Sequence, residues 1–215
     1  MGALTKEAPV TTILKINSSL YSEAGQSSQL ATQFVDALRE LDADARVIAR
    51  DVAREPLPHL DAARFQAFLT RPEERTAEQR AVTDYSDALI DELKQADVIV
   101  LGLPMYNFGI PSQLKAWFDH IARAGITFRY TEQGAVGLLT GKKAYVFATR
   151  GGAHAGTHRD SETSYVRTML GFLGIADVEF VYAEGLAMGE PVKTAALAQA
   201  QRRLQNLAQP VALAA

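Results

Sequence analysis

Short apolar runs alternate with helical patterns along most of the chain. Five runs have the length and residue types of β-strands, and they lie at 11–16, 46–49, 97–103, 144–148 and 178–182. Five segments carry apolar residues at helical spacing, at 28–41, from 76 to about 95, from 112 onward, at 161–173 and at 190–207. This alternation predicts an α/β fold, in which a doubly wound, five-stranded parallel sheet carries helices on both faces.

Two segments show neither pattern. Residues 51–75 contain Pro56, Pro58 and Pro72, which interrupt long elements, so we expect irregular structure there. Residues 125–141 form a long polar excursion before the fourth strand. No repeat, linker or low-complexity tract divides the sequence, and its 215 residues fit one domain, which we expect to span residues 11–215.

Composition limits the chemistry. The absence of cysteine excludes a thiol nucleophile and a cysteine-ligated metal or iron–sulfur site, so any redox reaction needs a bound cofactor. A net charge of −3 gives no footprint for nucleic acid. The longest apolar run, at 98–105, is too short to span a membrane, and the first residues lack the apolar run of a signal peptide. We therefore expect a cytoplasmic protein without a membrane partner.

Three loops follow strands of the predicted sheet and have unusual composition. In sheets of this class, ligands bind beyond the carboxyl ends of the strands, near the point where the strand order reverses. This rule selects the loops at 17–28, 104–111 and 149–156. Because the loops also stand out by composition, two independent arguments indicate the same edge of the sheet.

The first loop is rich in hydroxyls, has no lysine or arginine, and leads into a helix. Hydroxyls of Ser19 and Ser27, with amides near Gly25 and Gln26, are able to hold a phosphate at the positive end of the helix dipole. The alternative is an ordinary loop in which Ser27 or Ser28 caps the helix. The P-loop pattern, the G-x-G-x-x-G fingerprint and the G-x-S-x-G elbow are all absent, which leaves a mononucleotide as the favoured ligand and disfavours a hydrolase.

The second loop places large apolar side chains where the sheet opens to solvent. Met105, Tyr106 and Phe108 form a platform for a planar ring, and Asn107 is positioned to meet the polar edge of that ring. The alternative is that these side chains cap the core or the next helix.

The third loop carries the paired glycines Gly151 and Gly152, which allow a flat ligand to approach the backbone closely. Arg150 and His154 are able to donate hydrogen bonds or to stabilise negative charge on a reduced ring. His154 and His158 also suggest a metal site, but Gly156 lies between them and no H-E-x-x-H helix is present, so we expect no metal.

Long motifs resemble one enzyme family. The run P-M-Y-N-F-G-I-P-S-Q-L-K-A-W-F-D-H-I-A-R-A-G-I-T-F-R-Y-T-E at 104–132 is similar to the FMN-dependent NADH azoreductases, also called FMN-dependent NADH:quinone oxidoreductases. So are L-L-T-G-K-K-A at 138–144, T-R-G-G at 149–152 and F-L-G-I at 172–175. The similarity covers essentially the whole chain after residues 1–10, which look like an N-terminal extension.

The resemblance implies a flavodoxin-like fold and a homodimer with one FMN per subunit. It places the phosphate contacts on Ser19, Gly25, Gln26 and Ser27. It places the contacts to the isoalloxazine ring on the second and third loops, at Met105, Tyr106, Asn107, Phe108, Thr149, Arg150, Gly151 and Gly152. Two residues depart from the family pattern: Gly25 replaces a serine, so that only its backbone serves, and Thr149 replaces a serine but keeps the hydroxyl.

The resemblance also implies a reaction. NADH, or NADPH, passes a hydride to FMN in a ping-pong cycle, and a quinone or azo compound then receives two electrons. The excursion at 125–141 resembles a loop that reaches over the active site, often from the partner subunit, with Phe128 and Tyr130 covering the substrate. His154 is a candidate for stabilising charge on the pyrimidine side of the flavin and for contacting substrate. The physiological acceptor and the preferred nucleotide stay open.

Two other functions are alternatives to this one. A flavodoxin-type electron carrier binds FMN but reduces no small molecules, and carriers of this kind are usually shorter and more acidic than this chain. The net charge of −3 and the additional loop at 125–141 argue against it. An FMN-binding repressor or repressor-accessory module has no supporting interaction motif.

Overall fold

The computed structural model describes residues 11–212, so the predicted extension at 1–10 lies outside the described residues. The main sheet has five parallel strands in the order β2-β1-β3-β6-β7. These strands are β1 (Thr12–Asn17), β2 (Arg46–Asp51), β3 (Val98–Pro104), β6 (Lys143–Thr149) and β7 (Asp177–Ala183). The order confirms the predicted doubly wound, flavodoxin-like sheet.

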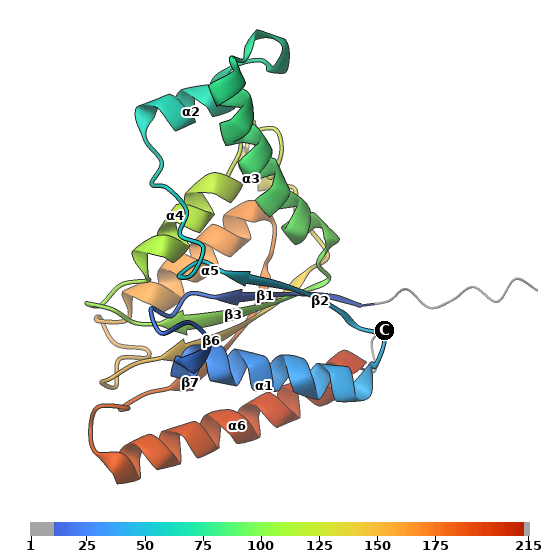
Figure 1. The fold of residues 1–215 in the computed structure, drawn as a ribbon. Helices are drawn as coiled ribbons and strands as arrows, with labels where there is room; N and C mark the ends of the chain where they lie inside the picture. Colours follow the sequence, from blue (N-terminus) through green and yellow to red (C-terminus); the bar gives the residue numbers. More distant parts are fainter. Residues whose placement is uncertain (1–10, 213–215) are drawn as a thin grey trace, which may run out of the picture.

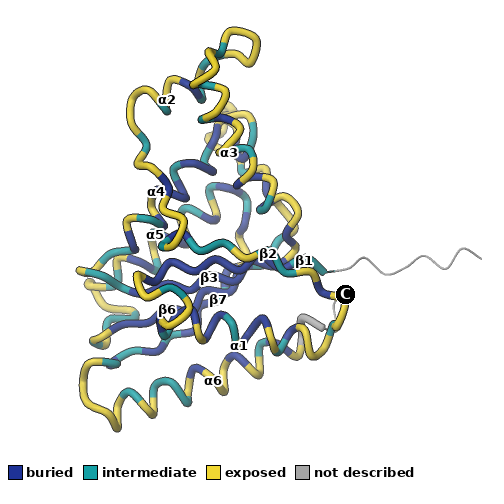
Figure 2. The backbone as a smooth tube through the Cα atoms, in the orientation of Figure 1, coloured by how far each residue is buried: buried dark blue, intermediate teal, exposed yellow. Residues whose placement is uncertain are grey.

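Helices cover both faces of this sheet, as Figure 1 shows. On one face lie α1 (Gln26–Leu41) and α6 (Glu190–Ala212), and on the other lie α3 (Ala77–Gln95), α4 (Ser112–Ile121) and α5 (Ser161–Leu173). Alternate side chains of β3 enter the two cores: Val100 packs with α1 and α6, whereas Leu101 packs with α3, α4 and α5. Burial on both faces explains the continuous apolar composition of β3, which is buried along its whole length (Figure 2).

The expectation of irregular structure at 51–75 was wrong in part. The helix α2 (Ala62–Leu69) lies within this segment and packs on α3, and a 3₁₀ turn, η2 (Pro72–Glu74), follows it. The Asp61 side chain caps α2 by accepting a hydrogen bond from the backbone N–H of Arg64 at 2.8 Å. The prolines flank the helix, so they mark its limits and do not prevent it.

The polar excursion at 125–141 also contains regular structure. It holds an antiparallel hairpin of β4 (Phe128–Thr131) and β5 (Gly134–Gly137), separate from the main sheet. Leu139 donates its backbone N–H to the carbonyl of Leu173 at 2.8 Å, which joins the hairpin's exit to the end of α5. Most residues of this hairpin are exposed, so the sequence contains no apolar run that would have predicted its two strands.

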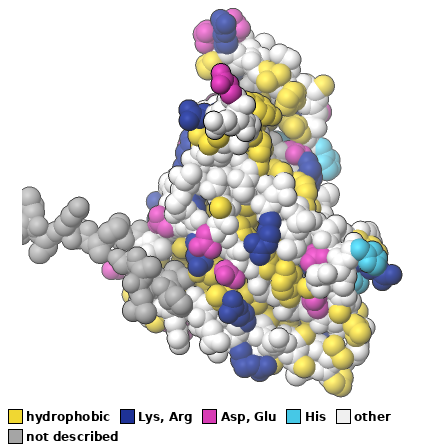
Figure 3. Space-filling model, turned by 180° about the vertical axis from the view of Figure 1, so that it is seen from behind, with side chains coloured by type: hydrophobic (Ala, Val, Ile, Leu, Met, Phe, Trp, Pro, Cys, Tyr) yellow, Lys and Arg dark blue, Asp and Glu magenta, His cyan; other side chains and the backbone are white. Residues whose placement is uncertain are grey.

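The surface carries both signs of charge. Acidic and basic side chains are interspersed with hydrophobic ones on the face shown in Figure 3. Within residues 11–212, no helix combines the length and apolar character needed to cross a membrane.

Candidate functional site

The main sheet presents a cleft at the carboxyl ends of its strands. The chain runs from β1 outward to β2 and then returns to β3 on the other side of β1, so the strand order reverses between β1 and β3. The loops after β1, β3, β6 and β7 enclose a cleft of about 180 Å³ at this point. Its lining residues are Ser19, Tyr21, Gly25, Gln26, Pro104, Met105, Tyr106, Thr149, Arg150, Gly151 and Leu186.

The cleft brings together eight of the candidate residues from all three predicted loops: Ser19, Gly25, Gln26, Met105, Tyr106, Thr149, Arg150 and Gly151. Ser27, Asn107, Phe108 and Gly152 are chain neighbours of this lining, and His154, Phe128 and Tyr130 lie further away in the sequence. Sequence reasoning missed Tyr21, Pro104 and Leu186. The loop after the fifth strand would have supplied Leu186, because the same carboxyl-end rule applies to it.

The first loop ends in the amino terminus of α1. A 3₁₀ turn, η1 (Ser22–Ala24), leads to Gly25, which occupies the N-cap position without any side-chain cap. The alternative that Ser27 or Ser28 caps the helix is therefore wrong, since both lie in its first turn. Their hydroxyls are buried and have no hydrogen-bond partner among the described residues. An unpaired buried hydroxyl beside free helix amides is suited to an anion.

Gly25 is required by close packing against Ser19. A Cβ at position 25 would overlap Oγ of Ser19 and lie 2.5 Å from its Cβ. The hydroxyl of Ser19 also lies 3.3 Å from the hydroxyl of Tyr106, which connects the first loop to the second. In the family pattern a serine stands at this position. In this chain the Ser19 side chain occupies the space that a side chain at position 25 would need.

Among residues 11–212, Lys15 approaches the first loop, and its charge is paired. Lys15, on β1, is nearly buried, and its Nζ lies 3.2 Å from Oε2 of Glu23 in η1 and 2.7 Å from Oγ1 of Thr32. Asn17 donates to the same Glu23 carboxylate at 2.8 Å. The charge of Lys15 is therefore paired with Glu23, so the helix amides and hydroxyls are the groups that remain for an anion.

The second loop contains a strained tight turn. Tyr106 and Gly109 exchange backbone hydrogen bonds of 3.0 Å, and the two residues between them, Asn107 and Phe108, have φ of +51° and +62°. Two successive positive φ values are typical of a type I′ turn, which is unfavourable for a phenylalanine. Strain of this kind often occurs at functional sites. The turn leaves Phe108 about half exposed, two residues after Tyr106 of the cleft lining.

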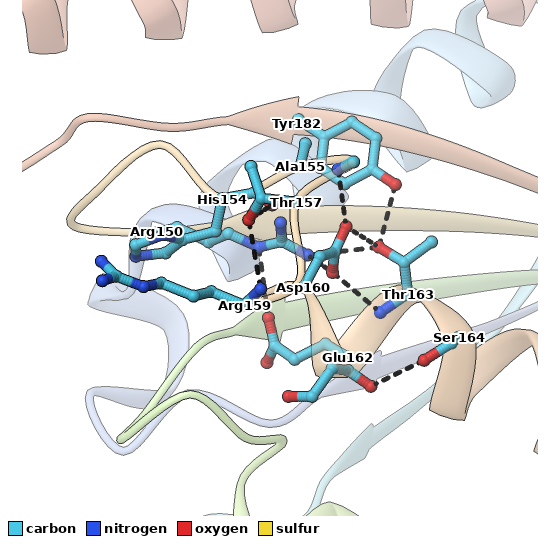
Figure 4. Close-up of polar contacts among 12 residues, drawn as sticks. Arg150, His154, Ala155, Thr157, Arg159, Asp160, Glu162, Thr163, Ser164 and Tyr182 are labelled. Atoms are coloured by element: carbon cyan, nitrogen blue, oxygen red, sulfur yellow. Dashed lines mark hydrogen bonds and ion pairs between the residues drawn. The ribbon is translucent and has the colours of Figure 1, made fainter.

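The third loop places the Arg150 side chain away from the cleft. The expectation that its guanidinium meets the ligand is not what the structure shows, because this group is buried among three carboxylates. Arg150 lies 2.6 Å from Asp160, 3.3 Å from Glu162 and 3.2 Å from Glu184. Figure 4 shows Arg150, Asp160 and Glu162 beside Tyr182, whose ring lies 5.2 Å from the guanidinium of Arg150. Arg150 can therefore line the cleft only through its backbone.

The pKa values of two carboxyl groups in this cluster are shifted in opposite directions. Burial raises the pKa of Glu162 to about 8, although the positive charge of Arg150 opposes the shift. Burial also opposes ionisation of Asp160, but hydrogen bonds from Arg150 and Thr163 outweigh it and hold the pKa of Asp160 below its usual value. Burial thus favours the neutral form of Glu162, whereas Asp160 is the ionised partner of Arg150.

The remaining candidate residues occupy the periphery. The rings of His154 and Phe108 are 5.5 Å apart, which brings the second and third loops together. Phe128 is buried against Phe172 of α5 in the same chain, whereas Tyr130 is 75% exposed. Among residues 11–212, no group of three or more His, Cys, Asp or Glu side chains is arranged to hold a metal ion.

Comparison with known proteins identifies the class first. A family model described as "Flavodoxin-like fold" matches residues 11–208. This match agrees with the strand order and with the position of the cleft, and the chain has the flavodoxin-like architecture.

Individual relatives identify the enzyme family within this fold. The chain is 57% identical over 192 residues to the FMN-dependent NADH:quinone oxidoreductase of Alcanivorax borkumensis, covering 89% of this chain and 97% of that protein. It is 52% identical over 197 residues to the protein of the same name from Cellvibrio japonicus, covering 92% and 98%. The chain belongs to the family of FMN-dependent NADH:quinone oxidoreductases.

A solved structure is also similar. The FMN-dependent NADH-azoreductase from Bacillus anthracis, determined in complex with FMN, superposes with a TM-score of 0.85 at 29% sequence identity. The match covers 94% of this chain and 100% of that one.

The raised pKa of Glu162 predicts a pH-dependent loss of stability. The carboxyl stays protonated in the fold up to about pH 8, whereas it ionises near pH 4.5 when the chain unfolds. The unfolded state therefore binds fewer protons between these values, and Glu162 makes the free energy of unfolding fall with rising pH, by at most about 1.4 kcal/mol per pH unit. Glu162→Gln, which keeps a neutral side chain, removes this contribution.

Urea unfolding from pH 5 to pH 8 measures the difference between the wild type and Glu162→Gln. We expect the wild type to lose stability relative to the variant as the pH rises. Glu179→Gln, at a partly exposed position on β7, is the control and should follow the wild type. Parallel curves for the wild type and Glu162→Gln would show that Glu162 is ionised in the fold.

Proposed function

We propose that this protein is an FMN-dependent oxidoreductase that uses NADH to reduce quinones and azo compounds. The main support for this proposal is the cleft at the point where the strand order reverses. The first turn of α1 meets this cleft at Gln26 and contains the unpaired buried hydroxyl of Ser27. The relatives named above support the reaction, because FMN and NADH stand in the names of proteins that match nearly all of this chain.

The residues of the cleft suit the phosphate of FMN. The amides of Gln26 and Ser27 lie in the first turn, at the positive end of α1, with the hydroxyls of Ser19 and Ser27 beside them, whereas the amide of Gly25 already donates to the carbonyl of Ser22 at 3.1 Å. Such a site binds a dianion by hydrogen bonds and dipole, without a free ammonium group. The absence of a side chain at Gly25 lets the Ser19 side chain pack against the start of α1, which places the Ser19 hydroxyl there.

The ring of FMN suits the other two loops. Met105, Tyr106 and Pro104 form one wall, and Thr149 and Gly151 form another, with Leu186 beside them. Asn107, Phe108, Gly152 and the backbone of Arg150 complete the proposed set from positions next to this lining. An apolar wall with a few polar groups fixes a flat ligand and excludes water from its faces.

When bound, FMN supplies the capacity to accept a hydride from NADH and to deliver two electrons to an acceptor. The chain contributes orientation. The strained turn at Asn107 and Phe108 fixes the rim, and the His154 ring, packed near Phe108, is placed to meet substrate or developing negative charge there. We assign the exposed Tyr130 to the cover over the site of a partner subunit, while Phe128, buried against Phe172, anchors the strand that carries it.

We propose further that the enzyme is a homodimer with one FMN per subunit. Exposed apolar side chains gather on loops at the carboxyl edge of the sheet, namely Leu20, Tyr21, Phe108 and Met188. Burying them against a second copy would remove this apolar rim from water. The cytoplasmic location and the use of NADPH alongside NADH stay predictions.

Sedimentation equilibrium tests the homodimer. The wild type should have twice the mass of the chain, and Tyr21→Asp should shift the equilibrium toward the monomer because it places a charge in the rim. Leu41→Asp changes an exposed residue at the far end of α1 and serves as the matched control. A wild-type mass equal to one chain would contradict the dimer.

Ser27→Ala tests the phosphate site. Loss of the hydroxyl should weaken FMN binding by roughly tenfold, measured by quenching of flavin fluorescence, because one hydrogen bond to a charged group is lost. The apoprotein should be unchanged or more stable by up to about 1 kcal/mol, because an unpaired buried hydroxyl is removed. Ser28→Ala removes the neighbouring buried hydroxyl and should leave FMN affinity nearly unchanged. Equal losses in both variants would refute the assignment of Ser27.

The reaction is tested by mixing the FMN-loaded protein with NADH and either menadione or methyl red. We expect NADH oxidation that requires both protein and acceptor, with parallel double-reciprocal plots as in a ping-pong cycle. A comparison with NADPH measures the nucleotide preference. NADH consumption at the rate without enzyme would instead support the electron carrier, which the interspersed charges on the face in Figure 3 do not favour.

A further inference from the structure

Glu184 lies directly after β7, at the carboxyl edge of the sheet, and none of the sequence arguments selected it. Its Oε1 atom accepts three hydrogen bonds from the third loop. The backbone N–H groups of His154 and Ala155 donate to it at 2.7 and 2.8 Å, and Nη1 of Arg150 donates at 3.2 Å. One carboxylate oxygen thus contacts both ends of the segment from Arg150 to Ala155.

The geometry suits an ionised carboxylate. Two successive backbone N–H groups that converge on one point form an anion-binding concavity. Hydrogen bonds to a charged acceptor are about twice as strong as those between neutral groups. The Glu184 side chain is only 19% exposed, so water competes weakly for these bonds. The carboxylate therefore acts as an internal anion around which the loop folds.

Backbone hydrogen bonds secure the first half of the same segment. Leu186 donates to the carbonyl of Arg150 at 3.1 Å, Ala187 to Gly151 at 3.0 Å, and Gly185 to Gly152 at 3.0 Å. These bonds connect the loop after β6 to the loop after β7, without continuing the register of the two strands. At His154 and Ala155 the Glu184 side chain provides the connection to the chain after β7.

The position of His154 affects the floor of the cleft. A Cβ at Gly152 would lie 2.7 Å from Nε2 of His154, so the imidazole folds back over the bare Cα of this glycine. The same imidazole packs near Phe108 on the second loop. A displacement of the His154 backbone would therefore move a side chain that touches both loops proposed to hold the flavin ring.

We infer that Glu184 is a positioning residue, which holds the segment from Arg150 to Ala155 in the shape that receives the flavin ring. The inference rests on the proposed function, because that proposal places the ring beside Gly151 and Gly152. Glu184 acts through the loop and does not line the cleft. Arg150 keeps Asp160 and Glu162 as partners when Glu184 is replaced, so the buried guanidinium is not left without a carboxylate.

Two variants of Glu184 test the inference. Glu184→Ala removes the acceptor for two backbone N–H groups and should weaken FMN binding by roughly tenfold, measured by flavin fluorescence. Glu184→Gln keeps an amide oxygen in the same place and should stay within about threefold of the wild type. Glu179→Ala removes a carboxylate of the same strand that pairs with Arg203 at 3.5 Å, and should bind FMN as the wild type does.

A second readout uses the apoprotein, without flavin. Arg159 is exposed on the same loop, so trypsin cleaves after it when the loop opens. Release of the fragment 160–215 should be roughly tenfold faster in apo Glu184→Ala than in the wild type, Glu184→Gln or Glu179→Ala. This rate reports the order of the loop and does not depend on where FMN binds.

The two readouts separate the possible failures. Faster cleavage together with weaker FMN binding in Glu184→Ala, and rescue of both by Glu184→Gln, supports the positioning role. Unchanged cleavage would overturn the inference about Glu184 and leave the proposed function intact. Faster cleavage with unchanged FMN affinity would show that the ring does not rest on this loop, and would overturn the proposed site together with the inference.

Discussion

The five strands of the main sheet run in the same direction, and the position of the site depends on this constraint. Parallel strands send every following loop to one edge, where the reversal of strand order between β1 and β3 leaves room for a ligand. Residues far apart in the chain, such as Ser19, Tyr106 and Leu186, therefore line one cleft. The burial of both sheet faces holds this edge in place, since neither layer of helices can move without exposing apolar surface.

Near this cleft, two positively charged side chains are each paired with a carboxylate. Lys15 is paired with Glu23 beneath the first loop, and Arg150 is paired with Asp160 behind the third. Both cations stabilise the loops and leave backbone amides and hydroxyls to face the ligand. A free cation there would attract any anion, whereas fixed dipoles select a phosphate of the right position and shape.

The sequence predicted well what depends on local pattern. The continuous apolar run at β3 and the helical spacing of α4 and α5 led to elements that the structure confirms, with limits that differ by a residue or so. The helix α2 was missed because flanking prolines suggested irregular structure, and the β4–β5 hairpin because its residues are mostly exposed. The loops of the site were predicted because hydroxyls and glycines are visible in the sequence.

The roles of single side chains were less accessible, because they depend on partners distant in the chain. Arg150 beside paired glycines resembles a ligand contact, but its guanidinium is held by Asp160, Glu162 and Glu184, which lie 10, 12 and 34 residues further along. Gly25 looked like the loss of a phosphate contact, yet Ser19 fills the space that a side chain would need. A buried charge needs a partner, and packed side chains need complementary shapes. Neither requirement produces a sequence motif with fixed spacing. The supporting residues of this cleft thus follow from the fold, whereas most of the residues that line it follow from the motifs.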